Sequence, residues 1–173
     1  PRTDADLVGV RLVHRQDRLD EPLEDDPLVA DCSVSCNVII AEVTRARCKL
    51  NGPWTRPEKE NVHRVLRAIG CFEESDIDKA AKELYRVGRY EDGFASCRLF
   101  AFGDQQSELP IAGVPQVLFN DMIDFNFRRL RQFLRQKSWV TNWPEGGEEL
   151  RVFANTPDLE RFRRDVRWHF QVG

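Results

Sequence analysis

Residues 37–44 read Asn-Val-Ile-Ile-Ala-Glu-Val-Thr, a run rich in β-branched side chains. Such a composition predicts a buried β-strand. Residues 5–14, ADLVGVRLVH, alternate well enough between apolar and polar side chains to predict a second strand. Between them, residues 17–31 hold seven acids, one base and two prolines, which indicates a long exposed connection. Because the two strands are neighbours along the chain, we expect them to pair antiparallel.

Amphipathic helices and further strands follow this pair. One helix is expected to begin near Pro57 and end at Gly70, and another to span about 75–87 and stop at Gly88. Residues 94–102 are apolar on both faces and predict an interior strand, and 114–119 a short one. Later helices are expected over 120–136 and from 156–157 onward. Residues 145–148, Glu-Gly-Gly-Glu, predict a loop.

This order of elements predicts an α/β fold. The expected architecture is a mixed sheet of four to five strands flanked by helices, because strands that follow helices can add in parallel. Residues 1–119 would form this core. Residues 120–173 would form a C-terminal helical extension packed on it.

Composition bounds the class of protein. The chain has 173 residues, of which 41% are hydrophobic, with eleven Phe and four Trp, and this excludes a disordered chain. No apolar run is long enough to cross a bilayer, so we expect no membrane partner. Five cysteines without a regular framework predict reduced thiols and a cytoplasmic protein. The net charge of −3 argues against coating nucleic acid by bulk electrostatics.

Positive charge is nevertheless concentrated in two segments, residues 44–67 and residues 128–137. Residues 44–67 carry seven bases against two acids and could face a polyanion. Trp54 lies among these bases and could stack on a nucleic-acid base, or it could instead fill the edge of the core. The predicted nucleic-acid contacts are Arg45, Arg47, Lys49, Trp54 and Arg56.

Two acids stand out by their context. Glu42 lies inside the β-branched run, where a carboxylate is costly to bury unless it is paired, hydrogen-bonded or bound to a cation. Asp6 begins the first strand, so strand pairing would bring it to the same end of the sheet. Magnesium, or manganese, accepts such carboxylates and can activate water against a phosphodiester. The alternatives are that Glu42 pairs with Arg45 or Arg11 and that Asp6 lies in a terminal turn.

Asp6-Leu-Val-Gly-Val, a gap, Val38-Ile-Ile-Ala-Glu42-Val-Thr44 and a helix together resemble the PD-(D/E)XK nuclease superfamily over about residues 3–105. The resemblance implies a restriction-endonuclease-like fold and a metal-dependent hydrolase acting on DNA phosphodiesters. Asp6 matches the first acid of the family, which begins one strand of a hairpin. Glu42 matches the glutamate of Glu-x-Lys on the next strand. Asp31 is a competing first acid.

The chain departs from the family pattern in two ways. Thr44 occupies the lysine position, and threonine carries no charge to offset the transition state. Lys49, Arg45 or Arg47 could supply a cation from a shifted position. The N-terminal helix and first strand of the family have no counterpart, so they are lost or lie upstream.

Two functions are therefore expected as alternatives. One is a magnesium-dependent endonuclease whose catalytic residues are Asp6, Glu42, Thr44 and Lys49, with the metal on Asp6 and Glu42. The other is a catalytically inactive module on the same fold that binds DNA or a protein partner. A homodimer is compatible with either function.

Overall fold

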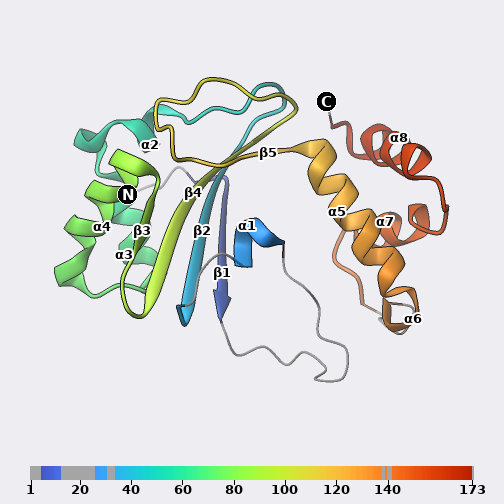
Figure 1. Ribbon diagram of the computed structural model, residues 1–173, viewed down its shortest axis with the longest axis horizontal. Coiled ribbons are helices and arrows are strands. Elements are labelled where there is room, and N and C mark those ends of the chain that lie inside the picture. Colours follow the sequence, from blue (N-terminus) through green and yellow to red (C-terminus); the bar gives the residue numbers. More distant parts are fainter. Residues whose placement is uncertain (1–4, 13–25, 31–33, 138, 140–141, 173) are drawn as a thin grey trace. The chain divides into compact units, whose positions relative to one another are not determined.

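The computed structural model describes residues 5–12, 26–30, 34–137, 139 and 142–172 (Figure 1). The chain divides into two compact units, Pro1–Gln116 and Val117–Gly173. The division expected from the sequence lies after Phe119. Asp31, the competing first acid, lies outside the described residues.

A mixed sheet forms the centre of the first unit. Strand β1 (Leu7–Leu12) pairs antiparallel with β2 (Cys36–Val43), and β2 pairs in parallel with β4 (Ala95–Gly103). Strand β3 (Arg89–Glu91) pairs antiparallel with β4, and the short β5 (Gln116–Leu118) also pairs with β4. The order β1-β2-β4-β3 confirms the predicted α/β class, the mixed sheet and the antiparallel first pair.

In the described part of the first unit, four helices and one 3₁₀ turn accompany this sheet. They are α1 (Pro27–Ala30), α2 (Gly52–Thr55), η1 (Pro57–Lys59), α3 (Asn61–Ile69) and α4 (Glu74–Val87). Helices α3 and α4 end where predicted, because Gly70 and Gly88 adopt the left-handed backbone at φ +71° and +76°. The expected single helix from Pro57 is interrupted. Glu60 is left-handed at φ 51°, so the α-helix starts only at Asn61.

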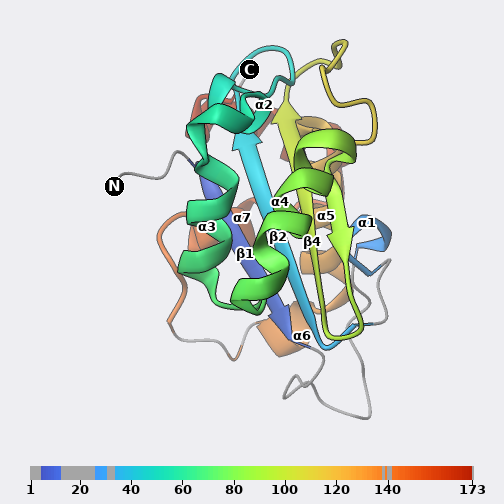
Figure 2. The same cartoon turned by 90° about the vertical axis from the view of Figure 1, so that its left-hand side faces the viewer.

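The two faces of the sheet have different covers. Helices α3 and α4 lie on one face (Figure 2), where Cys36 of β2 contacts Cys71 and Tyr90 of β3 packs on Phe72. Since side chains alternate along a strand, Val38, Ile40 and Glu42 share this face with Cys36. Helix α1 lies on the other face, and its Val29 carbonyl accepts a hydrogen bond of 2.8 Å from Asn37 Nδ2.

The second unit is helical. It contains α5 (Phe119–Gln132), α6 (Leu134–Lys137), α7 (Gly147–Phe153) and α8 (Leu159–Phe170). Its buried core comprises Ile123, Leu130, Ala154, Phe162 and Val166. The helix expected over 120–136 is divided at Phe133, which leaves the helical region at φ −115°. The loop expected at 145–148 is wrong in part, because left-handed Gly146 caps the start of α7. No helix among the described residues is long and apolar enough to cross a membrane.

Four cysteines of the first unit are free thiols in the structure, namely Cys36, Cys48, Cys71 and Cys97. The Cys36 Sγ lies 2.8 Å from the Cys71 Sγ. Burial, reinforced by the neighbouring Cys71 thiol, raises the pKa of Cys36 to about 12. Burial also raises the pKa values of Cys48 and Cys97 above the ordinary range.

We expect iodoacetamide near pH 8 to alkylate Cys71 before the other three of these thiols. The thiolate is the reactive species, and a pKa of about 12 leaves Cys36 with only about one ten-thousandth of its molecules ionised at that pH. Cys71 is the only one of the four that is not buried. Peptide mass spectrometry over a time course measures the order, and protein unfolded in urea should lose it. Faster labelling of Cys36 than of Cys71 would contradict this buried arrangement.

Candidate functional site

Glu42 is a buried carboxylate at the carboxyl end of β2, with 3% of its surface exposed. Its Oε2 accepts a hydrogen bond of 2.8 Å from the indole Nε1 of Trp54, and its Oε1 accepts one from the Asn51 amide Nδ2. Hydrogen bonds to an ionised acceptor are stronger than neutral ones and offset the cost of burying the charge. Glu42 therefore anchors the segment that follows β2.

The anchored segment is the start of α2. Asn51-Gly52-Pro53 turns the chain, and Pro53 occupies the first turn of the helix, where its missing N–H costs nothing. The Tyr85 hydroxyl of α4 lies 3.5 Å from the Pro53 carbonyl and accepts a 3.3 Å hydrogen bond from the Val62 N–H. Helix α2 is thus tied to β2, α3 and α4 at once.

Asp6 lies at the same end of the strand pair. Leu7 pairs with Ala41, so the register continued by one residue places Asp6 opposite Glu42. Its carboxylate Oδ2 accepts a 2.8 Å hydrogen bond from the Val43 N–H. Asp6 is exposed, whereas Glu42 points among the helices, so the two acids have different environments.

The oxygens of these acids are already hydrogen-bond acceptors. Both Glu42 oxygens receive an N–H, and so does Asp6 Oδ2. Among the described residues no three His, Cys, Asp or Glu side chains gather closely enough to hold a metal ion. Magnesium requires near-octahedral oxygen ligands at about 2.1 Å. Within the described part of the chain, protein N–H groups therefore already bind three of the four carboxylate oxygens of Asp6 and Glu42.

The Thr44 side chain binds backbone carbonyl groups. The Thr44 hydroxyl lies 2.6 Å from the Arg47 carbonyl oxygen and 3.2 Å from that of Phe102. The Thr44 N–H donates to the same Phe102 carbonyl at 3.0 Å. Thr44 thereby extends the pairing of β2 with β4 by one residue and turns the chain. Lys49 is exposed on the following loop.

We define residues 45–56 as the basic loop. Its backbone is fixed to the segment after β4: the Cys48 N–H donates to the Gln105 carbonyl at 2.8 Å, and the Asp104 N–H donates to the Ala46 carbonyl at 2.6 Å. Its four cationic side chains are exposed, and within the described part of the chain none of them makes an ion pair or a hydrogen bond: Arg45, Arg47, Lys49 and Arg56. A fixed backbone thus presents four free charges to solvent.

Trp54 has a different place from its four neighbours. Its side chain is 1% exposed, so the structure places it at the edge of the core, where it offers no free face to a nucleic-acid base. The contact of Asn51 with Glu42 is not predicted from the sequence. The sequence does hold a signal for this contact. A buried carboxylate needs hydrogen-bond donors, and the Asn51 amide and the Trp54 indole both follow β2.

Comparison with protein-family models, curated proteins and solved structures found no match to this chain. A functional proposal therefore rests on the topology of the first unit and on the residues at the carboxyl end of β2.

Proposed function

We propose that the first unit is a DNA-binding module on a restriction-endonuclease-like fold and that it has no nuclease activity. The supporting observation is that Glu42, at the position of the nuclease glutamate, holds Asn51 and Trp54 by hydrogen bonds. The topology is consistent with this fold. A strand that begins after Asp6 pairs antiparallel with the strand of Glu42, and a parallel strand follows the helices.

The basic loop would bind the phosphate backbone. A protein that neutralises phosphates releases condensed counterions, which makes the affinity dependent on salt. The free cations of this loop lie on a backbone that is already fixed, so binding would require little ordering of the chain. Since the whole chain has a net charge of −3, contact with DNA would be local to this loop.

The absence of a charge at Thr44 supports an inactive module. Stabilisation of developing negative charge by a positioned donor or cation is worth several kcal/mol in enzymes that use it. Thr44 directs its hydroxyl to backbone carbonyls instead. A magnesium-dependent hydrolase remains a second candidate, favoured by the register that sets Asp6 opposite Glu42.

We expect Arg45→Gln/Arg47→Gln to weaken binding of a 20-base-pair duplex about tenfold at low salt. Each lost phosphate contact should also reduce the slope of log affinity against log salt by about 0.9. Fluorescence anisotropy measures both quantities. Arg161→Gln/Arg164→Gln, two substitutions on α8 of the other unit, is the matched control and should change neither. An equal loss in both double variants, or no binding by the unmodified chain, would contradict the proposal.

Plasmid cleavage separates the two candidates. The proposed module leaves supercoiled DNA intact in magnesium or manganese. Cleavage by the unmodified chain that Asp6→Asn abolishes would instead establish the hydrolase.

A further inference from the structure

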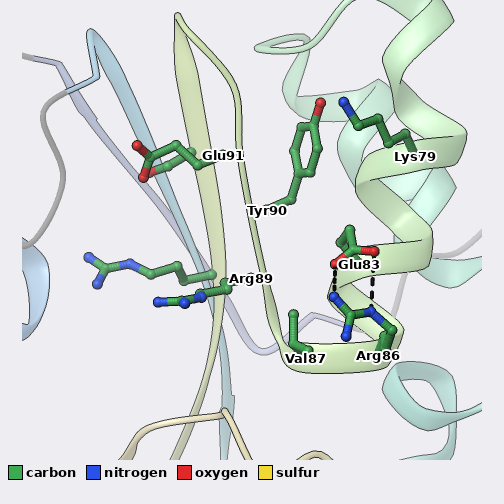
Figure 3. Close-up of a pocket in the computed structure, with 9 residues that line it drawn as sticks. Lys79, Glu83, Arg86, Val87, Arg89, Tyr90 and Glu91 are labelled. Carbon is green, nitrogen blue, oxygen red and sulfur yellow. Dashed lines mark hydrogen bonds and ion pairs between the residues drawn. The ribbon is translucent and has the colours of Figure 1, made fainter.

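Two arginines face each other across β3 and β4. Arg89 pairs with Arg98 in the antiparallel register, so both side chains leave the same face of the sheet. Figure 3 shows Arg89 and Glu91 on one side of β3, and Tyr90 with Lys79 of α4 on the other. Like charges placed directly opposite in a sheet are destabilising. An anion bound between the two arginines would remove this repulsion and stabilise the protein.

A pocket of about 500 Å³ opens beside this pair. Its walls include Pro27 and Leu28 of α1 and Pro115, and the two arginines are the only charged residues that line it in the described part of the chain. A second pocket, of about 610 Å³, continues around the edge of β3 and shares both arginines. The pair therefore borders accessible space on the face that carries α1.

Hydrogen bonds and ion pairs within the described residues use only part of the donors and charge of the two arginines. Arg98 donates from Nη2 to the Val29 carbonyl at 3.2 Å, and its guanidinium carbon lies 5.6 Å from the centroid of the Phe100 ring. These contacts orient the guanidinium. The Arg98 Nε is buried and has no hydrogen-bond partner within the described ranges. Arg89 makes no ion pair there, which leaves its full charge available.

The neighbouring acids that the structure describes do not neutralise the pair. Glu83 of α4 forms an ion pair with Arg86 of the same helix, so those two charges cancel each other (Figure 3). Glu91 is exposed and lies on the face of the arginines, two residues after Arg89. It forms no ion pair with any residue that the structure describes. Among the described residues that line it, the pocket beside α1 thus has two positive charges and no negative one.

We propose that Arg89 and Arg98 form a binding site for a small organic phosphate. A phosphate monoester carries a charge of about −1.5 to −2 at pH 7, which matches two guanidinium groups, whereas a single carboxylate would leave one charge unmatched. Guanidinium is the side chain best suited to bind phosphate oxygens in pairs. Pro27, Leu28 and Pro115 would contact the apolar body of the ligand. A pocket of about 500 Å³ has the size of a small-molecule site and is too small for a double helix.

Titration calorimetry of the full chain with phenyl phosphate tests this site, with inorganic phosphate and phenol as the two partial probes. We expect phenyl phosphate to bind more tightly than inorganic phosphate and phenol to give no signal. Arg89→Gln should weaken phenyl phosphate binding at least about tenfold. Arg67→Gln, which removes an exposed arginine of α3, is the matched control and should leave binding within about twofold.

Stability in the absence of ligand distinguishes this site from a structural role. Arg89→Gln relieves the repulsion from Arg98, so the ligand-free variant should melt at the same temperature as the unmodified chain or a higher one. A lower melting temperature would show that Arg89 stabilises the fold, and it would overturn the proposal. Equal affinity for phenyl phosphate and inorganic phosphate would also overturn it, as would displacement of phenyl phosphate by duplex DNA. Arg98→Lys, which keeps the charge but loses the fork of donors, should weaken binding without unfolding the chain.

Discussion

Glu42→Ala is expected to lower the free energy of unfolding by about 3 kcal/mol. The substitution removes the acceptor of two donors, the Trp54 indole and the Asn51 amide. A buried donor that loses its partner costs about 1–3 kcal/mol, and the indole lies in a side chain that is almost fully buried. Urea unfolding followed by tryptophan fluorescence measures the difference, because Trp54 is itself affected.

Glu42→Gln is the matched variant. It has the same length and keeps one side-chain oxygen, so it can still accept from one of the two donors, and we expect a loss of about 1–2 kcal/mol. The opposite outcome is informative. If Glu42 served only to bind a cation, then removing a buried charge would raise stability in buffer without divalent metal. A gain in stability for Glu42→Ala would therefore contradict the anchoring role.

The strands and the larger helices could be predicted because local patterns specify them. The β-branched run of β2 and the apolar stripe of α4, Ile77, Ala80, Ala81 and Leu84, are both buried as expected. Strand β3 and the start of α3 could not be predicted. Strand β3 has three residues, too few for a periodicity, and it exists because β4 supplies its hydrogen bonds. The start of α3 depends on the left-handed backbone of Glu60, a residue that seldom adopts it.

The location of the candidate site could be predicted from the sequence, but the hydrogen-bond partners of its residues could not. Strand pairing alone brings Asp6 and Glu42 to the same end of the sheet. The register of the structure, continued by one residue from Leu7, sets them opposite each other. The direction of the Glu42 side chain depends on α2, which packs between β2 and the helices and brings Trp54 to it. Asn51-Gly52-Pro53 favours a turn, but a turn signal does not show where the next side chains point. Arg89 and Arg98 lie opposite each other because of the register between β3 and β4, which no local sequence pattern specifies.

Gly103→Ala is expected to lower the free energy of unfolding by about 2–3 kcal/mol and to weaken DNA binding by the folded chain. A Cβ at Gly103 would lie 2.7 Å from the Cys48 nitrogen and 2.9 Å from the Ala46 carbonyl oxygen. Both are backbone atoms of the basic loop, so a side-chain rotation cannot relieve the clash. The loop must move away from β4, and overpacking of this kind costs about 1–3 kcal/mol.

Gly9→Ala provides the control for this effect, because an added Cβ there meets no atom within 4 Å. We expect it to keep or slightly raise stability, since alanine loses less backbone entropy than glycine when a strand forms. Urea unfolding gives the fraction of folded protein. Fluorescence anisotropy in buffer without urea, where both variants are folded, gives the DNA affinity. Reduced affinity in Gly103→Ala alone would show that the shape of the basic loop, beyond its charge, determines binding. Unchanged affinity in a destabilised Gly103→Ala would instead mean that the four cations act as a flexible cluster, and the role assigned to Glu42 would then be limited to stability.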